Sequence, residues 1–329
     1  LELELNGRHA ARKNGVEGDL ISTYLPLQSY NIDETVSGAG AKLLWRTSSN
    51  LLAVGAEYDH VWMRSTDSVI HVDTLNRKTD RWGFYLNDTL TVGNFSFSPG
   101  VRLDLTGTSG DQFSPSFGIT WQLTDTTLLR AYTARGYSLP AFVLDRTSEK
   151  VWTSQVGFES TIIPYLWLKG TLFRNDTWDI VTYDSFSNSF NHERHLKQGF
   201  EVEAKTAALF NTSLSAGYDY IDARNTSTHQ IVQDIPRHTL QLGVQYDDRQ
   251  YLKGVLNGRH IWWNAAGYHN GSYQGVIWDL HLTATPFGRR QHAPELFFSI
   301  RNIFNGSQYL DEFFKNAGRW VEGGMRISF

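Results

Sequence analysis

The chain contains no cysteine among its 329 residues. That absence excludes disulfide bonds, thiolate metal sites and cysteine nucleophiles together. The chain also has no run of the roughly 18 to 20 apolar residues that a membrane-spanning helix needs. Proline is scarce, at 8 residues, and the net charge of −4 gives no indication of a nucleic-acid partner.

Sequence motifs for catalysis are missing as well. We find no G-x-S-x-G elbow, no P-loop, no H-E-x-x-H pair and no dinucleotide-binding fingerprint after a strand. We therefore predict that the chain is not an enzyme and that it binds no cofactor. The segment HERH suggests a metal site, but His192 and His195 are three residues apart and would point to opposite faces of a strand. We predict no metal there.

What the sequence does contain is a strict alternation of apolar and polar residues. The segments FSFSPGVRLDL (95–105), LSAGYDY (214–220), TLQLGVQY (239–246) and GVIWDLHLTA (275–284) all show it. A period of two predicts a β-strand with one apolar and one polar face. We count about sixteen such segments of roughly ten to fifteen residues, and strands of that length are typical of transmembrane β-barrels.

The connections between these segments alternate between short and long. Short links are predicted at Thr47–Asn50, Gly93–Asn94, Thr124–Thr127, Ile163–Tyr165, Asn211–Thr212, Asp247–Gln250 and Gly288–Ala293. Longer links are predicted at Ser65–Asp80, Tyr137–Lys150, Asp184–His192, Asp222–Arg237, Ala265–Tyr273 and Asn305–Arg319, with a modest one at Thr106–Gln112. Short turns on one side and long loops on the other are typical of outer-membrane barrels, whose short turns are periplasmic.

The predicted fold is therefore an all-β, antiparallel, up-and-down transmembrane barrel that forms a single domain over residues 1–329. In hydrocarbon every backbone polar group must be paired, so a closed barrel is the arrangement left when helices are excluded. A soluble β-sandwich or β-helix is the alternative, because it also alternates. Charged residues on the polar face predict a water-filled or plugged lumen, and we expect these to face it: Arg102, Asp104, Glu201, Glu203 and Asp279, together with Arg130 and Arg135.

Aromatic residues near the predicted extracellular rim are the candidate ligand-binding residues. The segment HIWWNAAGYHNGSY (260–273) is the most site-like, because one of its two adjacent tryptophans should face the vestibule. The alternative, that these residues anchor the barrel in the membrane interface, is equally open. The candidates are Tyr137, Trp152, Tyr183, Trp262, Trp263, Tyr268, His269 and Tyr273.

The segment LFFSIRNIFNGSQYLDEFFKNAGRWVEGGMRISF (296–329) resembles the C-terminus of TonB-dependent outer-membrane receptors. In that family a strand leads into an Asn-Leu-Phe-Asn-like corner, then a loop, a Gly-Arg pair and a terminal strand that closes on Phe. Further matches follow in the family's order: FSPSFGITWQLTDTTLLRAYTARGYSLP (113–140), SQVGFES (154–160), with Gln155 in place of the usual Glu, GFEVEA and IPRHTLQLGVQY. The residues at the C-terminal motif positions are Asn302, Ile303, Phe304, Asn305, Gly318, Arg319 and Phe329.

The resemblance implies a receptor barrel of 22 strands filled by an N-terminal plug domain. About sixteen strands and no plug are visible here, so we expect the C-terminal part of such a barrel. The implied function is TonB-dependent uptake of a scarce, bulky nutrient such as a ferric siderophore, cobalamin or haem. The implied partners are this ligand, TonB through the missing plug, outer-membrane lipid and the barrel-assembly machinery.

A porin-like passive channel of about sixteen strands is the competing function, since lumens of that strand number are aqueous. An outer-membrane enzyme is a third. The terminal segment EGGMRISF resembles the signal by which barrels are recognised for insertion, and it places the C-terminus in the periplasm. The residues of this assembly signal are Glu322, Gly324, Met325, Ile327 and Phe329.

Overall fold

The structure is a computed structural model, and it describes residues 1–16, 30–68, 70–107, 109–139, 147–184, 189–233, 235–263, 275–289, 293–308 and 316–327. The described residues form sixteen β-strands and no helix. Among them there is no helix long and apolar enough to cross a membrane. The strands belong to one sheet in which each strand pairs with its neighbours in sequence, so the order runs from β1 to β16. This confirms the predicted all-β, antiparallel, up-and-down fold.

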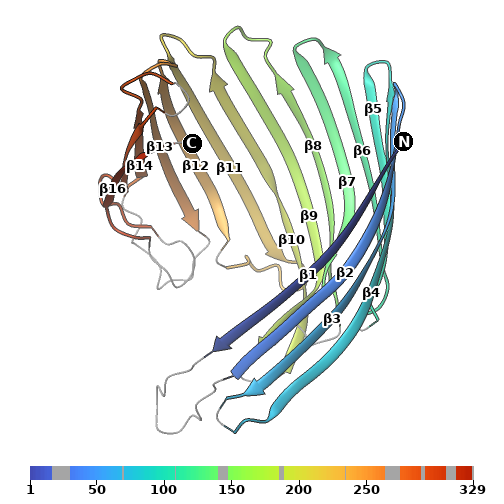
Figure 1. The fold of residues 1–329 in the computed structure, drawn as a ribbon. Coiled ribbons are helices and arrows are strands. Elements are labelled where there is room, and N and C mark those ends of the chain that lie inside the picture. Colours follow the sequence, from blue (N-terminus) through green and yellow to red (C-terminus); the bar gives the residue numbers. More distant parts are fainter. Residues whose placement is uncertain are drawn as a thin grey trace. The chain divides into compact units, whose positions relative to one another are not determined.

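Most strands are longer than those of ordinary globular proteins, which usually have five or six residues. Figure 1 shows them as a series of neighbouring arrows. The strands are β1 (Glu2–Val16), β2 (Tyr30–Arg46), β3 (Asn50–Asp67), β4 (Asp73–Val92), β5 (Phe95–Leu105), β6 (Gln112–Thr124), β7 (Thr127–Ser138), β8 (Glu149–Ser160), β9 (Leu166–Asp184), β10 (Ser189–Thr206), β11 (Thr212–Asn225), β12 (Pro236–Asp247), β13 (Leu252–Trp263), β14 (Ile277–Ala284), β15 (Glu295–Arg301) and β16 (Trp320–Arg326).

The contacts within the chain define two compact units. Unit 1 comprises residues 1–120, 132–153 and 178–192, and unit 2 comprises residues 121–131, 154–177 and 193–329. In the described residues the buried hydrophobic side chains are Val61, Ala134, Ala223 and Ile277. Among their described residues, neither unit therefore shows the dry apolar core that a soluble β-sandwich needs.

Each strand separates its side chains onto two faces, as the alternation predicts. In unit 2, Leu214 pairs with Val244, and Ala216 pairs with Leu242, on what we call the apolar face. The intervening residues belong to the opposite, polar face, where Glu201 pairs with Asp219. In unit 1 the same division places apolar pairs such as Val54–Leu86 and Leu86–Val101 on one face and Tyr85–Arg102 on the other.

The two ends of the strands differ in their connections. At what we call the turn end, the links cover residues 47–49, 93–94, 125–126, 161–165, 207–211, 248–251 and 285–294. At the opposite loop end they cover residues 17–29, 68–72, 106–111, 139–148, 185–188, 226–235, 264–276 and 302–319. Two predicted long loops are wrong. The strands β3 and β4 continue through most of Ser65–Asp80, and β10 begins at Ser189, within the link predicted at Asp184–His192.

The turn between β12 and β13 is fixed by a carboxylate. Three backbone N–H groups, those of Gln250, Tyr251 and Leu252, donate hydrogen bonds to Oδ1 of Asp248 at 2.7–2.9 Å. These hydrogen bonds lower the pKa of Asp248 below its ordinary value, because they stabilise the charged form. One acidic side chain therefore satisfies the donors that the tight turn would otherwise leave to water.

Glycines let aromatic rings lie flat across neighbouring strands. A Cβ atom on Gly55 would lie 2.3 Å from the ring of Tyr85, and one on Gly324 would lie 2.7 Å from the ring of Phe297. The same arrangement joins Gly258 to the Trp278 ring, at 2.8 Å. Ring and glycine therefore fill one space together, which gives a strand glycine the packing that it lacks by itself.

Candidate functional site

The polar face of unit 1 carries a ladder of charged side chains built from strands far apart in sequence. Arg8 donates from Nε to Asp59 at 2.8 Å. Arg102 donates from Nε to Asp104 at 2.9 Å and from Nη2 to Glu57 at 3.0 Å. The pairs lie on one face because Glu57 is opposite Gly83, which is in turn opposite Asp104.

Two tyrosines contact the charged residues of this ladder. The guanidinium carbon of Arg102 lies 5.7 Å from the ring centroid of Tyr85, within cation–π range. The hydroxyl of Tyr137 donates a hydrogen bond to Asp104, which is 5% exposed. The structure thus brings together Arg102, Asp104 and Tyr137, which the sequence predicted for two different roles.

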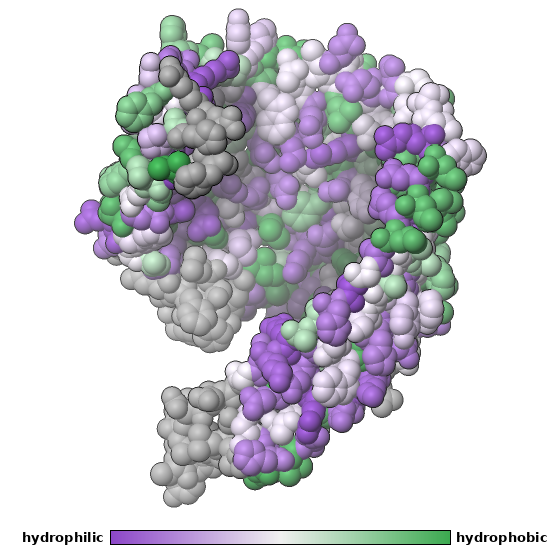
Figure 2. Space-filling model, in the orientation of Figure 1, coloured by the Kyte–Doolittle hydropathy of each residue, from purple (hydrophilic) through white to green (hydrophobic). Residues whose placement is uncertain are grey.

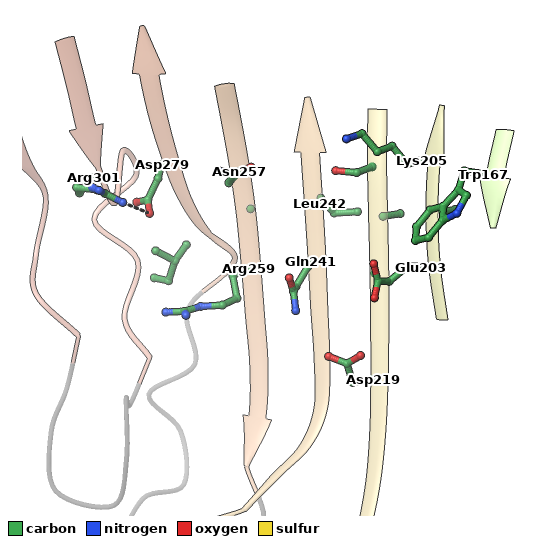
Figure 3. Close-up of a pocket in the computed structure, with 16 residues that line it drawn as sticks. Trp167, Glu203, Lys205, Asp219, Gln241, Leu242, Asn257, Arg259, Asp279 and Arg301 are labelled. Carbon is green, nitrogen blue, oxygen red and sulfur yellow. Dashed lines mark ion pairs between the residues drawn. The ribbon is translucent and has the colours of Figure 1, made fainter. Parts of the chain in front are cut away.

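The polar face of unit 2 contains a cavity of about 710 Å³. Figure 3 shows the charged side chains that line it. Glu203 and Asp219 come from β10 and β11, whereas Arg259 and Arg301 come from β13 and β15. The amides of Gln241 and Asn257 line the part between them. Each side of the cavity therefore carries both signs of charge, since Lys205 lies on the side of Glu203 and Asp279 on the side of Arg301, and amide groups lie between the two sides.

Several charged residues of this cavity are held by neighbours. Lys169 Nζ lies 2.8 Å from Glu203 Oε1. Asp279 accepts a hydrogen bond from the backbone N–H of Asn302 at 2.8 Å and lies 3.5 Å from Arg301 Nη1. Of the residues predicted to face a lumen, Glu203 and Asp279 line this cavity directly. Glu201 is the cross-strand partner of Asp219, on the same face.

The remaining predicted lumen charges also have partners. Arg130 lies 2.8 Å from Glu159 and donates to the Thr171 hydroxyl at 3.0 Å. Arg135 lies over the Trp178 ring, with its guanidinium carbon 5.8 Å from the centroid. That these charges face a lumen stays a prediction.

The predicted rim residues are dispersed. Trp262, on β13, lies on the apolar face because it pairs with His238, and it is 40% exposed. Trp152, on β8, is 42% exposed. Trp263 ends β13, and Tyr183 lies in β9. Tyr268, His269 and Tyr273 lie outside the described residues. A ligand-binding role for any of these residues stays a prediction.

Sequence reasoning missed a row of aromatic rings on the apolar face of unit 2. Ring centroids lie 5.8 Å apart for Phe200 and Tyr220, 5.2 Å for Tyr220 and His238, and 6.2 Å for His238 and Trp262. These four residues are successive cross-strand neighbours on β10 to β13. Each one was visible in the sequence, but their common height depends on strand register, which no single segment reveals.

The HERH segment lies within β10, and its two histidines do not lie together. His195 Nε2 lies 2.7 Å from Glu193 Oε2, and Arg194 forms a two-pronged ion pair with Asp176. No group of three or more His, Cys, Asp or Glu in the described part of the chain could hold a metal ion.

The C-terminal motif forms a polar corner after β15. Asn302 is 3% exposed and has a φ of 51°. Its side chain donates to the carbonyls of Gly306 and Ala317, at 2.8 and 3.1 Å, and accepts from the Gly306 N–H at 2.7 Å. The Arg319 N–H donates to Asn305 Oδ1 at 3.0 Å. The Asn and Gly-Arg positions of the motif thus hold the two ends of one loop together.

The predicted assembly signal lies partly on β16. Glu322 pairs with Ser299, Gly324 with Phe297, and Met325 with Leu296. Ile327 follows the strand, and Phe329 lies outside the described residues. The role of these residues in assembly, and a periplasmic location of the C-terminus, stay predictions.

Comparison with known proteins gives one family and a consistent set of structures. Residues 4–303 match a family model described as "TonB dependent receptor-like, beta-barrel". Three similar solved structures are the copper transporter OprC (TM-score 0.79), the ferric enterobactin receptor PfeA of Pseudomonas aeruginosa (0.75) and the FrpB iron transporter of Neisseria meningitidis (0.73).

The likeness to these structures is one of fold. Each is 15% identical in sequence, and they cover 99%, 99% and 98% of this chain. The chain in turn covers 62%, 59% and 59% of their lengths, so it spans about three fifths of the proteins that it matches.

Proposed function

The chain belongs to the TonB-dependent receptor β-barrel family, and we propose that it forms barrel wall in an outer-membrane receptor that imports a scarce, bulky nutrient. The match of residues 4–303 to the family model carries this proposal. The named functions of similar structures favour an iron chelate as the ligand, since they include ferric enterobactin, ferric citrate and siderophore receptors. Cobalamin and haem are the other candidates.

The two faces of the sheet fit this role physically. Large apolar side chains such as Val54, Leu86, Val101 and Leu103 are each 40–43% exposed on the apolar face. A contiguous surface of that kind is unstable in water and stable against hydrocarbon. The polar face would line the lumen, where paired charges remain hydrated. We assign the loop end to the outside of the cell and the turn end to the periplasm.

In the proposed receptor the polar face of each unit would contact a plug domain, through which TonB drives import. The ladder around Arg102 and the cavity lined by Glu203 and Arg259 would be the contact surfaces. The rim candidates Tyr137 and Trp263 would meet the ligand first, because they lie near the loop ends of their strands.

An uptake assay tests the proposal. The gene that encodes this chain is expressed in cells that lack their own iron receptors, and radiolabelled ferric enterobactin and ferric citrate serve as probes. We expect accumulation of one probe, abolished when TonB is removed. Accumulation that is equal without TonB, or steady conductance in planar bilayers, would instead support the porin-like channel. Failure of both probes would contradict the iron-chelate assignment.

A further inference from the structure

The apolar face of unit 2 changes its chemistry in a fixed order along β11. On β11 it carries Leu214 and Ala216 near the turn end, then Tyr218 and Tyr220, and then Asp222 and Arg224 near the loop end. The strand therefore passes from aliphatic to aromatic to charged side chains without leaving one face. Side chains two residues apart point the same way, so this order is a real gradient along the wall.

The two preceding strands also carry charged residues at the loop end of this face, although the order of their other side chains is less regular. On β10 the apolar face runs from Val202 through Phe200, Gln198 and Leu196 to Arg194, and Leu196 is the cross-strand partner of Arg224. On β9 it carries Leu172 and then Arg174 and Asp176, and the register is fixed by the contact of Asp176 with Arg194. We call Arg174, Asp176, Arg194, Asp222 and Arg224 the charged collar.

The spacing of the collar matches the thickness of a lipid headgroup layer. Arg224 lies four residues beyond Tyr220, which is about 13 Å along a strand and about 9 Å in height at the usual tilt of a barrel strand. Tyrosine and tryptophan rings in barrels mark the level at which hydrocarbon gives way to headgroups. The collar begins where the aromatic row of Phe200, Tyr220, His238 and Trp262 ends.

The charges of the collar favour an anionic partner. Three arginines face two aspartates, for a net charge of +1. Arg194 is paired with Asp176, and Arg224 Nε lies 3.0 Å from Asp222 Oδ2. Among the described residues Arg174 makes no ion pair, and it acts on Asp176 only through its charge. Arg174, Arg194 and Arg224 are all exposed, so their guanidinium groups are open to a ligand.

We propose that the charged collar binds the phosphate of anionic lipid headgroups in the leaflet at the loop end of the strands. A guanidinium offers two parallel N–H donors to a phosphate. A cation just beyond the aromatic row lies at the depth of the lipid headgroups. The occupant is a membrane lipid, because the collar continues the lipid-exposed apolar face. This inference rests on the proposed function only in taking that face to be the lipid-facing wall.

Unit 1 shows the same order independently. Its apolar face runs from Val54 through Tyr58, which packs on Trp82 with ring centroids 4.6 Å apart, to Lys78 and Arg64. Figure 2 shows the lower ends of β1–β4 as predominantly hydrophilic, with hydrophobic residues gathered further up the same strands. Charged residues begin directly beyond the aromatic pair, at Asp80, and a further aromatic residue, Trp62, lies opposite Lys78.

Native mass spectrometry of the full chain in detergent tests the proposal, with phosphatidylglycerol, phosphatidylcholine and glycerol phosphate as probes. We expect the chain to retain phosphatidylglycerol, and the double variant R174Q/R224Q to bind it about 25-fold more weakly, at roughly fivefold per arginine near a membrane surface. The double variant R174K/R224K should fall between them, because it keeps the charge and loses the paired donors. Arg259→Gln, on the polar face, is the matched control and should bind as the parent does.

Three outcomes would overturn the proposal. These are equal retention of phosphatidylcholine, an equal loss in Arg259→Gln, and full competition by glycerol phosphate, which would indicate a site for free phosphate. Quenching of Trp262 fluorescence by brominated lipid, read as the difference from Trp262→Phe, is measured in parallel. If brominated lipid quenches Trp262 but no headgroup is preferred, only the proposed lipid binding by the charged collar is contradicted. If Trp262 is not quenched, the lipid-facing wall on which the proposed function depends is contradicted.

Discussion

At the scale of single residues, Arg102 joins three neighbours on the polar face of unit 1. It bonds to Asp104 and Glu57 and lies over Tyr85. Asp104 is almost fully covered, so its carboxylate depends on Arg102 and Tyr137 for compensation. Removing the cation therefore leaves the covered Asp104 carboxylate without its charged partner, whereas the Glu57 side chain is 32% exposed.

We expect Arg102→Ala to lower the free energy of unfolding by about 1–3 kcal/mol, because the covered Asp104 carboxylate loses its charged donor. Urea unfolding of the chain in lipid vesicles measures the change. Arg46→Ala, at the exposed end of β2, is the control and should change stability by less than about 0.5 kcal/mol. The double variant R102A/D104A should recover part of the loss. Equal free energies of unfolding for Arg102→Ala and the control Arg46→Ala would show that the ladder does not stabilise the fold.

The sequence alone predicted part of how the side chains are placed on the strand faces. Alternation alone placed Arg102 and Asp104 on a shared face of β5, and Glu201 and Glu203 on a shared face of β10. It could not supply the partners, since Glu57 is 45 residues from Arg102 in the chain. The orientation of Trp262 was also undecided, because two adjacent tryptophans alternate and only the pairing with His238 fixes which one joins the apolar face.

At the scale of strands and loops, the sequence located the links better than it located where the strands end. The turn at Gly93–Asn94 was predicted correctly, because a glycine there adopts a φ of 58° between two alternating segments. The loop predicted at Ser65–Asp80 is instead mostly strand. Both faces are polar there, so alternation vanishes, while cross-strand contacts such as Arg64–Asp73 and Trp62–Asn76 continue the pairing.

Close strand approach gives a sharp prediction for two glycines on neighbouring strands. A Cβ atom on Gly199 would lie 1.8 Å from the backbone oxygen of Tyr220, whereas one on Gly217 would meet nothing nearer than 3.7 Å. We expect Gly199→Ala to destabilise the sheet by about 3 kcal/mol or to prevent folding. Gly217→Ala should be neutral or stabilise by about 0.5 kcal/mol, since alanine restricts the unfolded chain.

Refolding yield and urea midpoint, measured for both variants in one lipid composition, decide the matter. Because the two glycines lie on the same polar face, a general intolerance of methyl groups there would affect both. Similar losses in Gly199→Ala and Gly217→Ala would therefore contradict the packing argument.

The corner after β15 explains what its motif does physically. Asn302 combines a left-handed φ with side-chain hydrogen bonds to both ends of the loop, and asparagine is one of the few residues that tolerates this conformation. We expect Asn302→Gly to lose only the hydrogen bonds and Asn302→Ala to lose these and a further 1 kcal/mol or so of backbone preference. The folded fraction after insertion into vesicles, read by heat-modifiable electrophoresis, should therefore rank parent, glycine variant, alanine variant. Equal folding of all three would remove the corner from the determinants of folding.

At the scale of the whole molecule, the chain is organised by two faces and one gradient. The faces follow from a period of two maintained through sixteen strands, which the sequence shows directly. The gradient from aliphatic to aromatic to charged residues requires the strands to be in register, so it becomes visible only when paired strands are compared. That is why the fold and family were predictable, whereas the aromatic row and the charged collar were not.

The absence of cysteine makes the two faces directly testable. Any thiol introduced into this chain is the only one, so labelling by a membrane-impermeant maleimide reports on a single position. Two neighbouring positions on one strand lie close together but point to opposite faces of the sheet, so each is a control for the other. The matched pairs are Leu214 and Ser215 on β11, Gln241 and Leu242 on β12, and Leu256 and Asn257 on β13.

In lipid vesicles we expect Ser215→Cys, Gln241→Cys and Asn257→Cys to react quickly, because an aqueous polar face keeps their thiols ionisable and reachable. Leu214→Cys, Leu242→Cys and Leu256→Cys should be protected by hydrocarbon until detergent is added. A barrel wall predicts this alternation on all three strands at once, whereas a soluble sheet exposed on both faces predicts labelling throughout. Reactivity that does not alternate would therefore contradict the membrane-spanning wall even if every strand were placed correctly.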